Sequence, residues 1–475
     1  MPERNPGWSA WQGQAQIIFA ILIMAAPAFT PAASMMRLVF PALAAVVGAY
    51  WFYRQDPAKY VGFCFWLFIV TPFVRRIVDY KVGFTEGSLL MLAPYAAAAI
   101  AFVSLPQFFT RRQIRGQVAF AAVFLAVFYG FLLALLNGRV NAGAFDMLRW
   151  AVPPAIAAYI LVNDEHARAI GDEIRRCCLI ALPVLSLYGL YQYVAPPQWD
   201  AIWMIGSKMN SIGVPLPYQI RIFSTLNSPG SFAYYLLAFL LFGLSGRGML
   251  RFLSLGLGAA ALAVTLVRSA WLALAAGLLL LLIIGTWRVR VAILTVAGIA
   301  IFALPIAYTV PQVGQNLSAR LQSVTELSRD YSAADRSRGY TRMIADLQNN
   351  VMGSGLAVAG DYQSYQGEGA RRVIDGAVIE IFLALGVFGG CIYSAGIAAV
   401  VVAVLIRRTD GESELVRASR AILLAMTLAL ASGTTTVGEN GLLFWLAAGL
   451  SLAAKPIARE AYDPISPQVA LTVGA

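Results

Sequence analysis

Long apolar stretches separated by short polar segments recur along almost the whole chain. Runs of about 20 apolar residues are long enough to cross a bilayer as helices. A bilayer leaves exposed backbone groups no open alternative to the helix, so the pattern predicts an all-α polytopic membrane protein of about 12–14 transmembrane helices. The predicted spans lie near residues 15–32, 37–53, 60–74, 87–105, 117–136, 144–162, 175–194, 230–246, 252–267, 269–286, 290–309, 375–406, 419–434 and 440–454.

Two polar segments are longer than the other connections. The first lies near 195–229, and the second, 310–374, is the one extramembrane domain that the pattern predicts. Within the second, QNLSARLQSVTELSRD and DRSRGYTRMIADLQNN have helical spacing of apolar residues, and a glycine-rich loop follows them. We therefore divide the chain into N-terminal membrane helices (1–309), a large loop domain (310–374), C-terminal membrane helices (375–455) and a tail (456–475).

Composition agrees with this class of protein. Of the 475 residues, 59% are hydrophobic and only 12% are charged, whereas a soluble domain has about a quarter charged residues. The net charge of +11 does not indicate nucleic-acid binding, because membrane proteins concentrate Lys and Arg in their cytoplasmic loops. Placing both termini in the cytoplasm puts most of the short-loop Lys and Arg inside and both long polar segments outside.

Two carboxylates stand in the first turns of the predicted helix VIDGAVIEIFLALGVFGG, namely Asp375 and Glu380. Charges are costly in lipid and are rarely present there without a partner or a function. Asp is also a preferred helix N-cap residue, so a capping role for Asp375 remains open beside a functional one. Gly386 and Gly389 follow, and we predict that they permit close helix packing.

Arg221 and Arg268 interrupt apolar surroundings in QIRIFSTLNSPGSFA and TLVRSAWLAL. An arginine fork suits phosphate or carboxylate, so two of them at one leaflet form a candidate diphosphate clamp. The only histidine, His166, lies in a polar loop, and no acidic cluster is present, so the sequence predicts no metal site. Several other ionisable groups lie near the same leaflet and have snorkelling or mutual pairing as the simpler interpretation: Arg75, Arg76, Asp79, Asp146, Arg149 and Glu439.

These segments together resemble the O-antigen ligase and Wzy-type polymerase superfamily. Asp375-Gly376, nine residues, Gly386, two residues and Gly389 look like the family signature H[NSQ]x9GxxG. RIFSTLNSPGSFAYYL, TLVRSAWLAL and SRGYTRMIADLQNNVMGSG resemble further segments of that family in the same order, and the resemblance covers about residues 60–450. One departure is that Asp375 occupies the place of the family histidine.

The resemblance implies a GT-C-like fold in the bacterial inner membrane, with an active site facing the periplasm. It implies a polyprenyl-diphosphate-linked glycan donor, a glycan acceptor, no cofactor, and a chain-length regulator and flippase as possible partners. Asp375 would accept the proton of the acceptor hydroxyl, with Glu380 in reserve, because a carboxylate can act as a general base. Arg221 and Arg268, helped by Arg336 or Arg338, would stabilise the leaving diphosphate.

The departure at Asp375 favours a polysaccharide polymerase over an O-antigen ligase. A ligase and a protein O-oligosaccharyltransferase remain alternatives within the same chemistry. A solute transporter is the alternative from another class, but its charged groups would be expected near the bilayer midplane rather than at one face. A scaffold in an export complex is the remaining interpretation.

Overall fold

The computed structural model describes residues 6–112, 114–246, 250–309, 311–312, 314–315, 318, 331–358, 376–406 and 412–454. Within these residues the regular elements are helices, and one isolated bridge joins Gly213 to Ile220. The longer helices are α1 (Pro6–Ala25), α2 (Met36–Val47), α3 (Pro57–Val82), α6 (Gln117–Leu136), α7 (Val140–Val162), α8 (Ala167–Val194), α9 (Gln198–Ser207), α10 (Pro229–Leu244), α11 (Leu250–Thr265), α12 (Arg268–Ile284), α13 (Trp287–Tyr308), α15 (Tyr331–Asn349), α16 (Ala377–Leu405), α17 (Glu414–Leu428) and α18 (Gly438–Ala453).

Shorter helices connect these elements. The predicted span near 87–105 is built from η4 (Leu89–Leu92), α4 (Ala93–Ala98) and η5 (Ala99–Ser104), after which α5 (Leu105–Thr110) follows. The remaining short turns are η1 (Ala26–Phe29), η2 (Pro31–Met35), η3 (Gly48–Tyr53), η6 (Asp164–His166), η7 (Asn210–Ile212) and η10 (Ala429–Ala431). Each predicted apolar span therefore coincides with helical structure.

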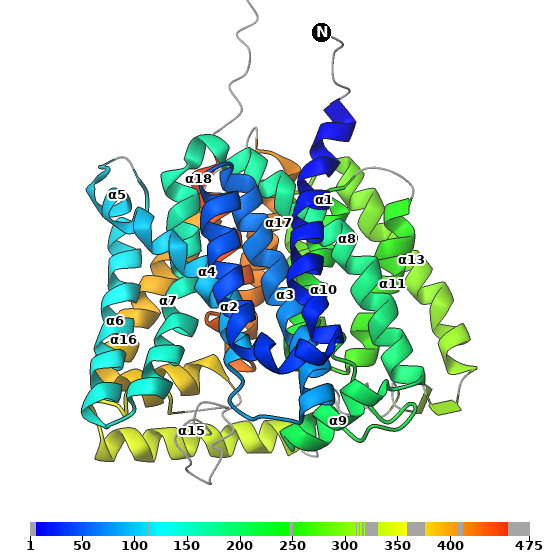
Figure 1. Cartoon of the computed structure of the whole chain (residues 1–475). Coiled ribbons are helices and arrows are strands. Elements are labelled where there is room, and N and C mark those ends of the chain that lie inside the picture. The colour runs from blue at the N-terminus through cyan, green and yellow to red at the C-terminus, as the bar shows by residue number, and fades with distance from the viewer. Residues whose placement is uncertain are drawn as a thin grey trace, which may run out of the picture.

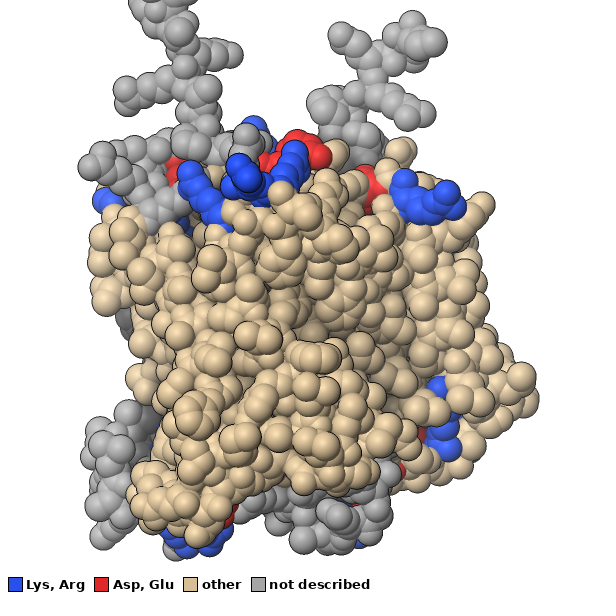
Figure 2. Space-filling view, turned by 90° about the vertical axis from the view of Figure 1, so that its left-hand side faces the viewer, with Lys and Arg blue, Asp and Glu red and all other residues tan. Residues whose placement is uncertain are grey.

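The described residues contain eight helical segments that are long and apolar enough to cross a membrane, and three shorter apolar helices. Figure 2 shows a belt free of charged side chains between an upper edge rich in Lys and Arg and a lower edge with fewer charged groups. The chain is therefore a helical membrane protein, as the sequence predicted.

The helices form one bundle (Figure 1), in which some are enclosed and others expose apolar side chains. Almost every residue of α10 and α18 is buried, and most of α3 and the C-terminal part of α7 are buried too. A helix that is apolar all round belongs in the interior of a bundle. By contrast, α6 and α12 keep large exposed apolar side chains, as a lipid-facing helix does.

The lower face of the bundle in Figure 1 carries α9 and α15, whereas the N-terminus lies at the upper face. The helix predicted within DRSRGYTRMIADLQNN is present as α15, which runs across this lower face. The other predicted helix of the large loop lies outside the described residues. We refer to this side, with α9 and α15, as the lower face.

A break in α16 shapes the lower face. Gly386 has φ 65° and ψ −166°, which interrupts the helix inside its first three turns. Residues 351–358, hereafter the inserted segment, pair with the free backbone groups: Ser354 N–H donates to Leu383 O at 2.9 Å, and Val387 N–H donates to Val351 O at 2.9 Å. Gly386 therefore permits a close approach, as predicted, but the partner is the inserted segment at a break rather than a packed helix.

Two further glycines allow this close approach. A Cβ on Gly353 would lie 2.2 Å from Gly386 N, and one on Gly355 would lie 2.4 Å from Ala134 N in α6. Gly389 does serve close packing, because a Cβ there would lie 2.9 Å from the Tyr129 ring. Residues 353–358, the described beginning of the glycine-rich loop, thus pack closely against the bundle.

Candidate functional site

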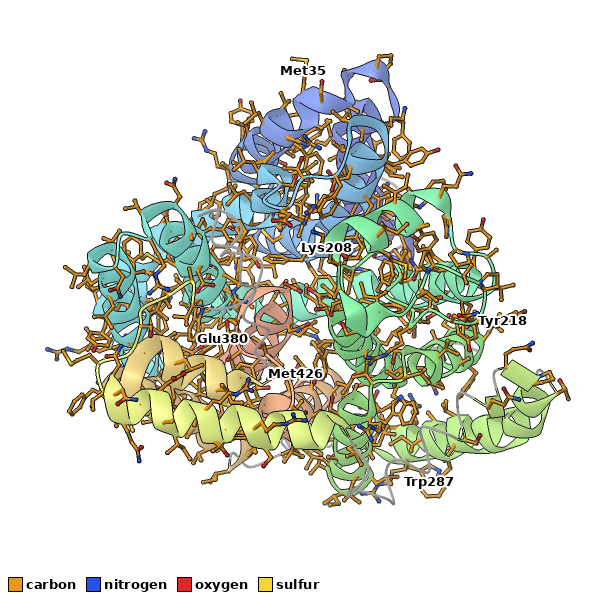
Figure 3. The ribbon with its side chains drawn as sticks, turned by 90° about the horizontal axis from the view of Figure 1, so that it is seen from below. Met35, Lys208, Tyr218, Trp287, Glu380 and Met426 are labelled. Atoms are coloured by element: carbon orange, nitrogen blue, oxygen red, sulfur yellow. The ribbon has the colours of Figure 1, made fainter. Side chains whose placement is uncertain are left out.

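An ion cluster lies in the bundle one turn inside the lower face. Arg149 of α7 donates to Glu380 of α16 through Nη2 and to Asp146 Oδ1 through Nε at 2.8 Å. The side chains of Asp146, Glu380 and Arg149 are 4%, 9% and 15% exposed. Seen from below, Glu380 lies toward the interior of the bundle rather than at its rim (Figure 3). The cluster therefore pairs inside the protein and does not snorkel toward water.

Local structure explains why these side chains meet. Asp146 and Arg149 are three residues apart on α7 and so share one helix face. Glu380 lies in the first turn of α16, where the helix dipole favours a negative charge. The N-cap position of α16 is Gly376. Asp375 itself lies outside the described residues, so its capping and functional interpretations both remain predictions.

Both oxygens of Glu380 are occupied. Arg149 binds Oε1, and the hydroxyl of Thr434 donates to Oε2 at 3.0 Å. Asp146 is likewise held twice, because its Oδ2 accepts the N–H of Ala357 in the inserted segment at 2.7 Å. The cluster is therefore joined directly to the inserted segment of the large loop.

A second carboxylate, Glu439, lies in the first turn of α18. Its Oε1 accepts a hydrogen bond from the Ser231 hydroxyl at 2.8 Å, and its backbone carbonyl accepts one from Tyr235 at 3.0 Å. Asn440, the next residue, donates to Thr434 O at 3.0 Å and so connects Glu439 to the ion cluster. Glu439 is half-buried and forms no ion pair with any residue that the structure describes. Of the two simpler interpretations, snorkelling and mutual pairing, pairing with another described residue is not seen.

Arg221 and Arg268 meet at the junction between α11 and α12. The Arg221 guanidinium donates to Thr265 O at 3.1 Å and to Leu266 O at 3.4 Å, and it also holds Ser211 O at 3.1 Å. Arg268 begins α12 two residues after Leu266 and is half-buried. Arg221 thus binds the backbone just before Arg268, where it caps the last carbonyls of α11.

Contacts connect this junction to the carboxylates. Ser269, next to Arg268, lies 3.2 Å from the hydroxyl of Tyr234 in α10. A Cβ on Gly433 would lie only 2.4 Å from the same hydroxyl, and Thr434 follows it and binds Glu380. The arginine junction and the ion cluster therefore lie near one another, with Tyr234 between Ser269 and Gly433.

Helix α15 lies against the same region. A Cβ on Gly339 would lie 3.0 Å from Ile379 Cδ1, and the Tyr340 hydroxyl donates to Ala431 O at 3.5 Å. Arg338 is exposed and stands beside these contacts on α15. The side chain of Arg336 lies outside the described part of the chain.

Three other candidates are structural, as their simpler interpretation predicted. Asp79 pairs with Arg75 at 3.3 Å and with Arg37 at 3.1 Å. Arg76 is fully buried, pairs with Asp200 at 3.2 Å, and donates to Ser224 O at 2.5 Å and Leu226 O at 3.0 Å. This buried pair anchors the loop that carries Arg221.

Among the described residues, no group of three His, Cys, Asp or Glu side chains could hold a metal ion. Comparison with known proteins adds no assignment: no protein-family model matches the chain, and no curated protein sequence matches it.

Proposed function

We propose that this protein is a bacterial inner-membrane glycosyltransferase that polymerises polyprenyl-diphosphate-linked oligosaccharide repeat units for an exopolysaccharide or O-antigen. In this proposal all fourteen apolar segments cross the membrane in a GT-C-like arrangement, both termini are cytoplasmic, and the lower face is periplasmic. The upper edge rich in Lys and Arg supports this orientation, because cytoplasmic loops carry an excess of these residues (Figure 2).

One observation carries the proposal: the arginine junction lies near the carboxylates Glu380 and Glu439 at one end of a membrane bundle. Cationic donors beside carboxylates are the groups that glycosyl transfer from a lipid diphosphate requires. The arginine side chains would stabilise the negative charge that develops on the leaving diphosphate. The carboxylate side takes a proton from the attacking hydroxyl.

In the proposed step, the oxygen of an acceptor hydroxyl forms a bond to the anomeric carbon of the donor sugar. The bond between that carbon and the diphosphate oxygen breaks, and polyprenyl diphosphate leaves with the electron pair. The hydroxyl proton passes to a carboxylate of the protein. Arg268 is assigned to the diphosphate, with Arg336 and Arg338 of α15 as further donors and Arg221 holding the junction in place.

Three carboxylates at this end are candidates for the proton acceptor. Both oxygens of Glu380 already accept hydrogen bonds, so we assign Glu380 to positioning Arg149. Asp375 immediately precedes the N-cap of α16 and is the acceptor that the family resemblance implies. Glu439 is the candidate that the structure adds, because Ser231 orients one oxygen and no cation of the described residues neutralises it.

A ligase that transfers a finished glycan, or a protein O-oligosaccharyltransferase, uses the same donor chemistry and remains the alternative. The solute transporter is less well supported. The substrate site of a transporter would lie near the bilayer midplane. In this protein the carboxylates Glu380 and Glu439 lie in the first turns of α16 and α18.

The test is complementation of a strain that lacks the gene with Arg268→Ala, Asp375→Asn or Glu439→Gln. Loss of one donor to a developing oxyanion lowers turnover roughly 100-fold to 1,000-fold, so Arg268→Ala is expected to leave single-repeat lipid-linked products. Of the two carboxylate variants, the one that removes the proton acceptor gives the same product pattern. The measurement is the size distribution of lipid-linked glycan at matched protein levels in the membrane.

Arg342→Ala and Glu86→Gln are the matched controls, because both side chains are exposed on the described surface. They are expected to leave polymer length unchanged. Normal polymer from Arg268→Ala and from both carboxylate variants would refute the site. Long polymer that accumulates on the carrier lipid without transfer would assign the chain to the ligases, where the flippase and a chain-length regulator would act upstream of it.

A further inference from the structure

A groove of about 470 Å³ opens at the lower end of α8, beside α9. This volume lies within the range of about 300–1,000 Å³ that small-molecule sites occupy. The groove belongs to the rim of the bundle, because Tyr218, adjacent to its lining, lies at the edge in the view from below (Figure 3). The lining residues are Tyr191, Ala195, Pro196, Pro197, Gln198, Trp199, Pro215 and Pro217.

The Trp199 ring is held in a fixed orientation. Its Nε1–H donates to the Tyr188 hydroxyl at 2.8 Å, and that hydroxyl donates to Asp200 Oδ2 at 2.7 Å. Asp200 is in turn fully buried and paired with Arg76 at 3.2 Å. A buried hydrogen-bond network thus fixes the Trp199 ring at the surface. Because the ring is already ordered, binding a ligand costs less conformational entropy.

Polar groups accompany the rings. Gln198 accepts a hydrogen bond from Tyr80 at 3.0 Å through Oε1, and its amide NH₂ donates to no residue that the structure describes. Tyr191 is 53% exposed, and its hydroxyl likewise has no bond with a described residue. The lining contains no Asp, Glu, Lys or Arg, so nothing in it compensates a charged ligand.

We propose that this groove binds a neutral segment of glycan, with sugar C–H faces on the rings and sugar hydroxyls on the amide. This inference rests on the proposed function and assigns to the groove the glycan chain rather than the diphosphate. Pro215 and Pro217 belong to the loop that ends in Arg221, so the groove and the arginine junction are carried by one anchored segment. A phospholipid fits less well, because its headgroup is charged and its acyl chains would leave the amide unpaired.

The test is binding of the full-length detergent-purified protein to an array of neutral oligosaccharides of gluco, galacto and manno configuration. The variants are Tyr191→Ala and Gln198→Ala, both at exposed positions. The matched control is Leu187→Ala, one turn earlier on α8, because Leu187 is 55% exposed and does not line the groove. We expect the two groove variants to bind about tenfold more weakly than the wild type and the control to bind equally well.

Absence of neutral-glycan binding by the wild type would overturn the inference. So would variants that bind glycan normally but co-purify with less phospholipid, since the groove would then be a lipid site. Binding requires no turnover, so the two proposals fail separately. Glycan binding without polymer formation would support the groove as a glycan site and contradict the proposed glycosyltransferase activity. Polymer formation without glycan binding would support that activity and contradict the groove as a glycan site.

Discussion

Arg149→Ala is expected to abolish polymer formation and to destabilise the protein. The change would leave the carboxylates of Asp146 and Glu380 buried without their shared cation. Breaking a buried ion pair in this way costs about 3–5 kcal/mol, because the remaining charge is not compensated. The measurement is thermal unfolding of the purified protein together with the amount of polymer made in the complemented strain.

A combined variant separates stability from function. Arg149→Met with Glu380→Gln and Asp146→Asn removes all three charges of the cluster, so it is expected to recover most of the lost stability, because neutral replacements of buried ion pairs are often tolerated. It is not expected to recover polymer formation if the pair positions groups at the site. Recovery of normal polymer by the combined variant would show that the cluster serves the fold alone, and an Arg149→Ala protein as stable as the wild type would contradict the burial argument.

Gly386→Ala is expected to destabilise the protein nearly as much as Arg149→Ala, because alanine does not fit the backbone conformation at this position. The φ and ψ of Gly386 lie in a region that is essentially restricted to glycine. A Cβ there would also lie 2.3 Å from the carbonyl carbon of Met352. Strain of about 1–3 kcal/mol adds to this overlap, so a loss of at least about 3 kcal/mol is expected.

Gly256→Ala in α11 is the matched control, because its added Cβ would meet no atom within 4 Å. Alanine is favoured over glycine inside a helix, so this control should be neutral or slightly stabilising. Both variants would be followed by thermal unfolding in the same detergent. An equally stable Gly386→Ala protein would mean that α16 is continuous and that the inserted segment does not fit into a break.

The sequence predicted the helices well because lipid imposes one dominant rule. Apolar residues must cover the outside of each span, and the backbone must bond internally, so the pattern alone locates the segments. Ion pairing within one helix could also be predicted from the sequence, as for Arg75 and Asp79, which are four residues apart on α3. These features depend on neighbours along the chain.

Contacts between distant segments could not be predicted in the same way. The break at Gly386 depends on the inserted segment, and the Gly353-Ser-Gly355 pattern indicated a loop without indicating its partner. Asp200 was missed as the partner of Arg76, because nothing in the sequence connects α9 to α3. The hydrogen bond from Ser231 to Glu439 could not be predicted either, since it depends on how α10 and α18 pack.

The most direct test of the central claim is reconstitution of the purified protein in lipid vesicles with a polyprenyl-diphosphate-linked repeat unit. We expect lipid-linked chains of two or more repeats to appear together with free polyprenyl diphosphate, one released for each bond formed. We also expect Arg268→Ala to slow this release and Arg342→Ala to leave it unchanged. An intact donor and no released polyprenyl diphosphate with the wild-type protein would contradict the proposed glycosyltransferase activity.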